Sequence, residues 1–329
     1  MKGQNLSPHV SVIILNWNGW KDTIECLESL FISDYVNYDV ILVDNASTDD
    51  SLQKIQDYCD NLISVESNFI PSNPYNNPIK ISKYKNNGVN LLNLDNIGSN
   101  ISDLNKKLTL IINDKNYGFS EGNNIAIRYA IDKLETDYIF LLNNDTVISK
   151  DSLGKLVRFL DFNEKRGIVG SKIYEYDIES NIIQSSGGYI NFNKYPGYFP
   201  LNQGFVDVDD INGSMECDWI TGAALMIKSD LLPKNLLNTN FFFGCEDIDL
   251  CINVKKRGFN INVLLDSKIW HKGRISRKKK FKNISAINHG VKTNLKFLKK
   301  NNNYFFLHLP LYLISICLLY IIFFIKSKL

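Results

Sequence analysis

Four short apolar runs, each ending abruptly in polar residues, constrain the fold most strongly. They occupy residues 10–15, 38–43, 108–112 and 138–142. A continuous run of four to eight apolar residues is typical of a strand buried on both faces, as in parallel sheets. Segments with helical spacing lie between them, at 23–31, 51–58 and 125–134. Alternation of this kind predicts an α/β fold with a parallel sheet.

The remainder of the chain continues this pattern less regularly. We expect a helix over 151–162, strands at 167–173, 219–227 and 261–265, and a helix that carries Leu250 and Val254. Residues 66–107 break the rhythm, because they are rich in Asn, Ser and Lys and contain Pro71, Pro74 and Pro78. We interpret them as an inserted, partly irregular excursion. Residues 174–215 are expected to be rich in loops.

The C-terminal region has a different character. Residues 305–325 read FFLHLPLYLISICLLYIIFFI, and about 20 apolar residues suffice to cross a bilayer. We therefore divide the chain into a main domain (1–275), a basic linker or helical region (276–303) and a membrane-associated or transmembrane helix (304–329). A helix lying in the membrane plane or packed in an oligomer remains an alternative. Lysines on both sides give little indication of topology.

Charge and cysteine content narrow the class of protein. The formal net charge is +2, so nothing global indicates nucleic acid as a partner. Basic residues crowd 268–300, a stretch suited to anionic lipid or phosphate. The six cysteines form no C-x-x-C pair, and we interpret them as reduced, buried thiols of a cytoplasmic protein. The first apolar run is too short for the core of a signal peptide.

Polar residues at strand ends are the first candidates for a functional site. In an open α/β sheet a ligand binds beyond the carboxyl ends of the strands. Clusters at 16–18, 44–45 and 143–145, and His271, occupy such positions, although any one alone could be a turn or a helix cap. The chain contains neither G-x-G-x-x-G after its first strand nor G-x-x-x-x-G-K-[ST]. A phosphate-rich ligand would then need Mg²⁺ or Mn²⁺, held by oxygen ligands such as Asp145.

Several ordered motifs together resemble family 2 glycosyltransferases, especially the rhamnosyltransferase-like and galactofuranosyltransferase-like branch. They are VSVIILNWNG (10–19), VDNASTDDS (43–51), NYGFSEGNN (116–124), LLNNDT (141–146), WITGAALMI (219–227), FFGCEDIDLC (242–251), and Trp270-His271 followed by Ser276. The resemblance covers residues 10 to about 276 apart from the excursion. It implies a GT-A nucleotide-diphospho-sugar transferase fold, a Rossmann-like mixed sheet flanked by helices, followed here by the C-terminal hydrophobic helix.

The resemblance also implies roles on the donor side. Asn16 and Asp44 would contact the nucleotide base and ribose, and residues 143–145 stand where the family carries D-x-D. Asp145 would hold the metal on the diphosphate, and His271 would complete that site. A structural histidine is the alternative. Because Asn143 replaces a carboxylate, a second direct metal bond there is in doubt. The remaining residues implied near the donor are Asn45, Gly118, Asn124, Asn143 and Asn144.

On the acceptor side, the resemblance implies a general base at the start of a helix. Asp247 matches the family's base, and Glu246 would position the acceptor or act in its place. An inverting transfer needs one such base for the acceptor hydroxyl. The competing interpretation is that both are carboxylates favoured at a helix N-terminus. Trp219, Thr221 and Gly222 match a segment that walls the acceptor pocket, although Trp219 could equally belong to the core.

We therefore expect a metal-dependent inverting glycosyltransferase at the cytoplasmic face of the cell membrane. Its donor would be dTDP-rhamnose or a UDP-sugar, and its acceptor a glycan or lipid-linked glycan in cell-surface polysaccharide or glycoconjugate assembly. A sugar-phosphate nucleotidyltransferase and a non-catalytic, membrane-bound glycan-binding protein are the alternatives. The first usually carries a Gly-rich phosphate loop near the N-terminus, where this chain has Asn-Trp-Asn-Gly.

Overall fold

The computed structural model describes residues 7–70, 78–94, 107–192, 197–208, 212–233, 236–273 and 284–328. Its strands are β1 (Val10–Asn16), β2 (Tyr38–Asp44), β3 (Lys80–Asn86), β4 (Leu91–Asn93), β5 (Lys107–Asn113), β6 (Tyr138–Asn143), β7 (Thr146–Ile148), β8 (Arg166–Glu175), β9 (Ile183–Ser185), β10 (Gly188–Asn191), β11 (Gly197–Pro200), β12 (Ser214–Cys217), β13 (Ala224–Lys228) and β14 (Asn260–His271). Its helices are α1 (Trp20–Phe31), α2 (Ser51–Cys59), α3 (Gly118–Leu134), α4 (Ser152–Asp161), α5 (Glu246–Lys256), α7 (Ile284–Asn301), α8 (Phe305–Lys328) and the 3-10 turn η1 (Ser229–Leu231). The expectations for Pro71, Pro74, Ser276 and the basic cluster at 274–282 lie outside the described residues.

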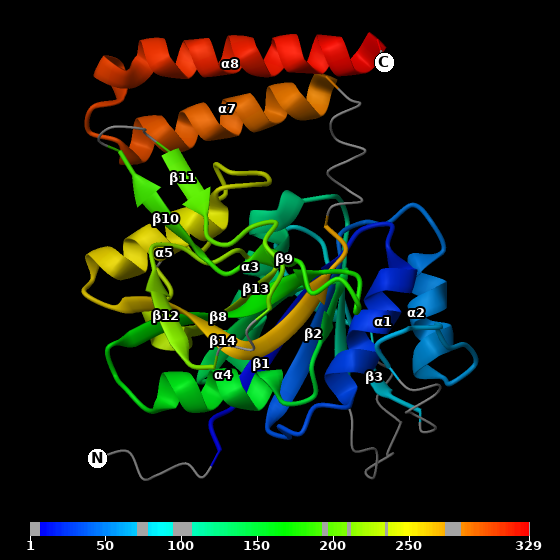
Figure 1. Cartoon of the computed structure of the whole chain (residues 1–329). Coiled ribbons are helices and arrows are strands. Elements are labelled where there is room, and N and C mark those ends of the chain that lie inside the picture. Colours follow the sequence, from blue (N-terminus) through cyan, green and yellow to red (C-terminus); the bar gives the residue numbers. More distant parts are fainter. Residues whose placement is uncertain are drawn as a thin grey trace.

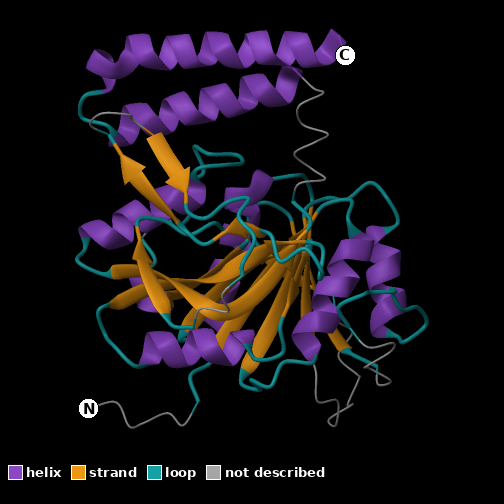
Figure 2. Ribbon diagram, viewed as in Figure 1, coloured by secondary structure: helices purple, strands orange, loops and turns teal. Residues whose placement is uncertain are grey.

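A single large mixed sheet forms the centre of the molecule (Figures 1 and 2). Its strand order is β12-β14-β8-β13-β6-β1-β2-β5-β3-β4, with β7 on β14 and β9 on β8. Strands β6, β1, β2, β5 and β3 are mutually parallel. Strand β13 is antiparallel to both β6 and β8, and β14 is parallel to β8. Strands β8 and β14 therefore run in the same direction as β6 and the four strands parallel to it. The carboxyl ends of seven strands therefore meet at one edge of the sheet.

Both faces of this sheet are covered, as continuous apolar strands require. Along β1, Val12 and Ile14 pack on the side of α1, whereas Ile13 packs on the side of α3. All three are fully buried. Burial of each such side chain contributes about 1.5–3 kcal/mol relative to leaving it in water. The apolar runs are unbroken because successive side chains of each strand pack into hydrophobic cores on opposite faces of the sheet.

The four runs that were expected to be central strands are confirmed as β1, β2, β5 and β6. Three expected boundaries were wrong. The run 219–227 is a strand only from Ala224, because Gly222 donates its N–H to Asp247 rather than to a neighbouring strand. Strand β14 continues past 265 to His271, since it pairs with β7 as well as β8. Helix α3 begins already at Gly118, so residues 118–124 of the 116–124 motif form its first turns.

The described part of the 66–107 excursion is more ordered than expected. β3 adds to the sheet parallel to β5, and β4 adds antiparallel to β3. An unpaired edge strand exposes a row of backbone donors and acceptors, and β3 satisfies those of β5. The excursion therefore widens the sheet beyond the four central strands.

Two long helices, α7 and α8, lie side by side above one end of the molecule (Figure 1). In α8, residues Phe305–Ile325 have a mean hydropathy of 2.3, and 17% of that stretch is buried, so by length and composition this helix can cross a membrane. The buried residues in the described part of α8 are Phe305, His308, Tyr312 and Phe323. All six cysteines are free, and five are buried as expected. The expectation was wrong for Cys317, which lies exposed on the outer surface of α8.

Candidate functional site

The ends of β1 and β2 are joined by a buried hydrogen-bond network. Asn16 donates from Nδ2 to Asp44 Oδ1 over 2.8 Å, and both side chains are fully buried. The backbone N–H of Ser47 donates to Asp44 Oδ2 at 3.0 Å, and its hydroxyl donates to Oδ1 at 2.6 Å. The carboxylate of Asp44 thereby shapes its own loop. The structure brings these two predicted donor residues together, and their contact with a base or ribose stays a prediction.

The turn after β6 is tied to the same network. Asn144 donates to Thr23 Oγ1 at 3.0 Å, and that hydroxyl donates to Asn16 Oδ1 at 2.9 Å. Thr23 stands in the first turn of α1. The half-buried residues Asn143, Asn144 and Asp145 are therefore held beside the end of β1.

Asp145 and His271 form the pair best suited to a divalent cation. Asp145 Oδ1 lies 3.0 Å from His271 Nε2, and Asn143 Nδ2 lies 3.4 Å from the same nitrogen. Burial tends to raise the pKa of Asp145, but the hydrogen bond and charge of His271 outweigh it and lower that pKa below its usual value. A carboxylate and an imidazole are ligands that Mn²⁺ accepts.

Asp145 and His271 would supply only two ligands to such a cation. Within the described ranges no three His, Cys, Asp or Glu side chains gather as a metal cluster. A cation at Asp145 and His271 would therefore need additional oxygen ligands from a diphosphate or from water. This donor set fits a metal that arrives with a nucleotide better than a permanently held one.

Three of the predicted donor residues serve mainly to fix loops. Asn45 accepts from the N–H of Tyr117 at 3.0 Å and donates to the carbonyl of Gly118 at 3.1 Å. Asn124 exchanges two hydrogen bonds of 2.9 Å with the backbone of Leu237. Gly118 has φ +74°, and a Cβ there would lie 2.6 Å from Phe242. Glycine permits this close approach, so Gly118 joins α3 to the loop before α5.

Asp247 stands in the first turn of α5, opposite the loop 219–223. Its Oδ2 accepts the N–H of Gly222 at 2.9 Å, and its Oδ1 accepts the N–H of Ile248 at 2.8 Å. Burial raises the pKa of Asp247, and these backbone donors together with the hydroxyl of Thr221 offset the rise only in part. Its neighbour Glu246 is buried as well. A carboxylate with a raised pKa is a better proton acceptor than an ordinary one.

One short segment connects the two groups of residues. The N–H of Asn143 donates to the carbonyl of Ala223 at 3.0 Å, directly after the Gly222 that bonds Asp247. Trp219 in the same loop is buried, packs against Gly188 and lies edge-on to Tyr198. Its indole N–H has no hydrogen-bond partner among the described residues. The loop is thus a wall shared by both parts of the site.

Helix α7 contacts strand β11 as well as the segment that precedes and begins α5. Asn294 Oδ1 accepts the Tyr198 hydroxyl at 2.7 Å, and His289 Nε2 lies 3.2 Å from the carbonyl of Phe243. Lys300 reaches both carboxylate oxygens of the buried Asp249 at 2.7 Å. The sequence had suggested a basic linker or helical region over 276–303, and nothing in the sequence pairs α7 with the helix of Asp247.

Two further residues near Asp145 escaped sequence reasoning. Lys272 donates its backbone N–H to the Asp145 carbonyl at 3.0 Å, while its ammonium contacts Asp22 at 2.7 Å and Glu25 at 2.6 Å. Gln184 contacts His271 through both ends of its side-chain amide. Neither follows a long apolar run, so the strand-end rule could not identify them. That rule does apply to Asn113, which is the last residue of the central strand β5 and donates to Asn45 Oδ1 at 3.0 Å.

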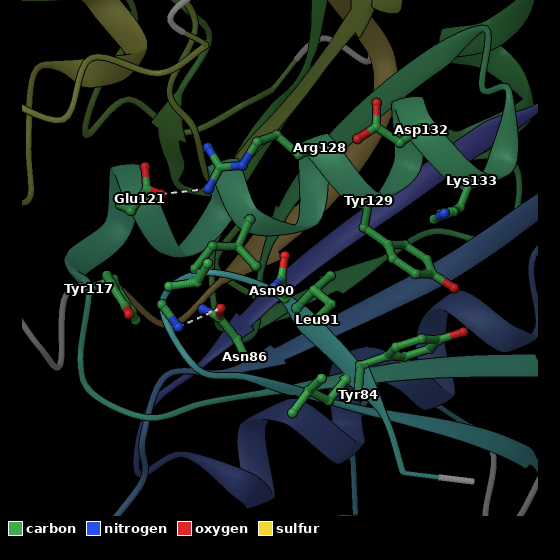
Figure 3. A pocket seen from close by; sticks show the side chains of 14 residues that line it. Tyr84, Asn86, Asn90, Leu91, Tyr117, Glu121, Arg128, Tyr129, Asp132 and Lys133 are labelled. Atoms are coloured by element: carbon green, nitrogen blue, oxygen red, sulfur yellow. Dashed lines mark hydrogen bonds and ion pairs between the residues drawn. The ribbon is translucent and has the colours of Figure 1, made fainter.

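A separate cavity of about 570 Å³ runs beside α3 and the β3–β4 hairpin (Figure 3). Among its lining residues, the rings of Tyr84 and Tyr129 contact each other edge-on with their centroids 5.1 Å apart, and Arg128 pairs with Glu121 at 2.5 Å. None of the predicted site residues lines this cavity. The site described above is therefore a different region, at the carboxyl edge of the sheet.

Comparison with known sequences points to one family. A family model described as "Glycosyl transferase family 2" matches residues 11–77 and 93–217. The chain is 25% identical over 162 residues to "Rhamnosyltransferase WbbL" of Escherichia coli K12, a match covering 44% of this chain and 57% of the relative. It is 27% identical over 155 residues to "Low-salt glycan biosynthesis hexosyltransferase Agl10" of Haloferax volcanii, covering 44% and 46%. The matches thus span about half the length of these relatives.

Comparison with solved structures supports the fold. The mannosyltransferase PcManGT from Pyrobaculum calidifontis, in complex with GDP-Man and Mn²⁺, has a TM-score of 0.57 at 14% identity, covering 95% of this chain and 74% of that one. GalNAc-T7 with UDP, GalNAc and Mn²⁺ has a TM-score of 0.54 at 14% identity, covering 82% and 44%. At such identity the likeness concerns the fold alone, and it confirms the expected GT-A class.

Proposed function

The chain belongs to glycosyl transferase family 2, and we propose that it is a metal-dependent glycosyltransferase that inverts the configuration at the anomeric carbon of its donor sugar. One observation carries this proposal. The loop that supplies an N–H to Asp247 also accepts the N–H of Asn143, two residues before Asp145. A proton acceptor and the turn that carries the candidate metal-binding carboxylate are therefore fixed to a single wall, as a displacement between two substrates requires.

On the donor side, Asp145 and His271 would hold Mg²⁺ or Mn²⁺. The cation would supply positive charge to the leaving diphosphate. Asn16, Asp44, Asn143 and Asn144 would surround the nucleotide. We assign Asn45, Gly118 and Asn124 the task of shaping that surface, because their polar groups or close packing hold backbone segments in place.

On the acceptor side, Asp247 would act as general base. It takes the proton of the acceptor hydroxyl as that oxygen bonds to the anomeric carbon, while the bond from that carbon to the diphosphate oxygen breaks. A single displacement of this kind inverts the configuration. Glu246 would position the acceptor, and Trp219, Thr221 and Gly222 would form its wall. The raised pKa of Asp247 supports the assignment, because it favours proton uptake.

We further propose that the donor is dTDP-rhamnose, with a UDP-sugar as the second choice, and that the acceptor is a glycan or lipid-linked glycan. The name of the Escherichia coli relative supports rhamnose, and that of the Haloferax relative supports a hexose. The apolar helix α8 supports assembly at a membrane. Because nucleotide-sugars are made in the cytoplasm, we place the active site on its cytoplasmic face.

A donor screen tests this function. The full chain would be heated with Mn²⁺ or Mg²⁺ and a panel of nucleotide-sugars, and the unfolding temperature recorded. A true donor stabilises the fold by mass action, by about 2.7 kcal/mol at a hundred times its dissociation constant. Donor hydrolysis or transfer is then measured with the stabilising compound. The proposal fails if no nucleotide-sugar is bound or hydrolysed, and pyrophosphate release from a nucleoside triphosphate and a sugar phosphate would indicate a nucleotidyltransferase instead.

Flotation with vesicles tests the membrane assignment separately. The full chain should float with vesicles containing anionic lipid, whereas a chain ending at residue 304 should remain largely in the dense fraction. Resistance of the bound full chain to high salt would show that apolar insertion, rather than basic charge, is responsible. Equal flotation of both chains would contradict a role for α8.

A further inference from the structure

The side-chain amide of Gln184 contacts His271 at two atoms, the backbone carbonyl oxygen and Nδ1 of the ring. Gln184 lies on β9 and is 3% exposed. Its Nε2 donates to the backbone carbonyl of His271 at 3.0 Å, and its Oε1 lies 2.6 Å from His271 Nδ1. A side-chain amide offers one donor end and one acceptor end. Because the carbonyl requires the donor end, the acceptor end must face the imidazole.

This orientation determines which ring nitrogen carries hydrogen. An amide oxygen only accepts, so Nδ1 of His271 must be the protonated nitrogen of the neutral ring. In that neutral ring the lone pair of Nε2 points toward Asp145 Oδ1, 3.0 Å away, and toward the amide of Asn143; when Nε2 also carries hydrogen, it donates to Asp145 Oδ1 instead. A lone pair facing a carboxylate at this distance calls for a positive centre that contacts both atoms, which is the hydrogen on Nε2 in the charged ring and can be a divalent cation on the neutral ring. The pair is thus arranged as two ligands of one cation.

We propose that Gln184 is a positioning residue that fixes the tautomer and ring orientation of His271 and so presents Nε2 to the divalent cation. This inference rests on the metal site of the proposed function. Outer partners of metal-binding histidines commonly have this effect, and their loss costs about 10- to 100-fold in metal affinity. Gln184 would act only through His271, since it contacts neither Asp145 nor the region of the diphosphate by any hydrogen bond in the described chain.

Direct measurement of Mn²⁺ binding tests the inference without an acceptor. Mn²⁺ would be titrated calorimetrically into the full chain in the presence of dTDP, and then of UDP. Gln184→Leu, which has similar volume but no polar end, should weaken Mn²⁺ binding by about 10- to 100-fold. Gln184→Glu, which can still accept from Nδ1, should lose much less. Gln184→Met provides a second apolar variant should Leu impair folding.

The chain offers a matched control. Gln203 is exposed and donates to the backbone carbonyl of Gln184 at 3.1 Å, but it does not touch His271. Gln203→Leu should leave Mn²⁺ affinity within about twofold of wild type, since a surface contact of this kind is worth little. In a His271→Ala background, Gln184→Leu should have no additional effect on Mn²⁺ affinity.

The tautomer itself can be observed by NMR in the absence of metal. The chain has four histidines, and loss of one signal in His271→Ala assigns the ring. At a pH at which the ring is neutral, we expect hydrogen on Nδ1 in the wild type and a mixture or reversal in Gln184→Leu. The role of Gln184 would be overturned, and the proposed metal site left standing, by unchanged Mn²⁺ affinity in Gln184→Leu. The same conclusion would follow if Gln184→Leu lowered Mn²⁺ affinity equally in the wild-type and His271→Ala backgrounds. Failure of the wild type to bind Mn²⁺ with either nucleotide would instead refute the proposed metal site.

Discussion

The proposed donor side and the proposed acceptor side of the site are built in different ways. Asn16, Asp44 and Asn143 are the last residues of three adjacent parallel strands. Asp247, by contrast, depends on the loop 219–223 and on α5, with α7 packed behind. The donor side is therefore a direct product of sheet topology, whereas the acceptor side is assembled from segments far apart in sequence. The same substitution made on each side should thus have different consequences.

The largest effect is expected from Asp145→Asn. Removing this charge should weaken donor binding in the presence of Mn²⁺ and reduce transfer by about 10³-fold or more, since a metal's charge stabilisation is worth several kcal/mol. Thermal shift with the donor and steady-state transfer rates measure the two effects. Asp230→Asn, an exposed carboxylate on η1, is the control. Donor binding that survives Asp145→Asn unchanged would remove the proposed difference between the two sides.

Asp247→Asn is expected to have the next largest effect, on transfer alone. Loss of a general base costs about 10²–10⁴-fold, whereas donor affinity should stay within about twofold because the change lies on the acceptor wall. The matched control is Asp218→Asn, a carboxylate near the same wall that pairs with Lys255 at 2.5 Å. Transfer at the wild-type rate would show that Asp247 is not the base, and Glu246→Gln would then be tested in its place.

The pH dependence of transfer provides a third, more graded comparison. Asp247 accepts a proton only when ionised, and burial raises its pKa above the ordinary 3.8. The rate should therefore fall about tenfold per pH unit as pH drops below that raised pKa. Asp247→Asn should lose this acid limb of transfer, while the pH dependence of donor binding should stay as in the wild type, because Asp247 lies on the acceptor wall. Residual transfer by Asp247→Asn that keeps the full acid limb of the wild type would contradict the assignment.

The smallest expected effect concerns the support that α7 gives to α5. Lys300→Met removes a cation from Asp249, whose side chain is 3% exposed. Because Asn238 and Asn301 still contact that carboxylate, the free energy of unfolding should fall by only about 1–3 kcal/mol. Transfer should fall a few-fold while donor affinity is unchanged. The exposed Lys299 on the same helix is the control, and equal losses in Lys299→Met would show a general charge effect.

The sequence predicted the central strands because each is a short apolar run buried on both faces, and this pattern depends on local composition. It predicted the strand-end residues for the same reason, since the carboxyl ends of parallel strands must meet at one edge. It missed the length of β14 and the start of β13. Those boundaries depend on which backbone groups find partners, such as Gly222 with Asp247, and no local pattern records that pairing.

The amino-acid sequence by itself determined the α/β class, the order of the central strands and helices, and the membership of glycosyl transferase family 2. Only the tertiary structure decided that Gln184 contacts the imidazole ring of His271 and that α7 packs against the helix that carries Asp247. These contacts join residues 87 and 51 positions apart in the chain. The physical reason is that periodicity reports burial, whereas the partner of a buried polar group is set by how distant segments pack together.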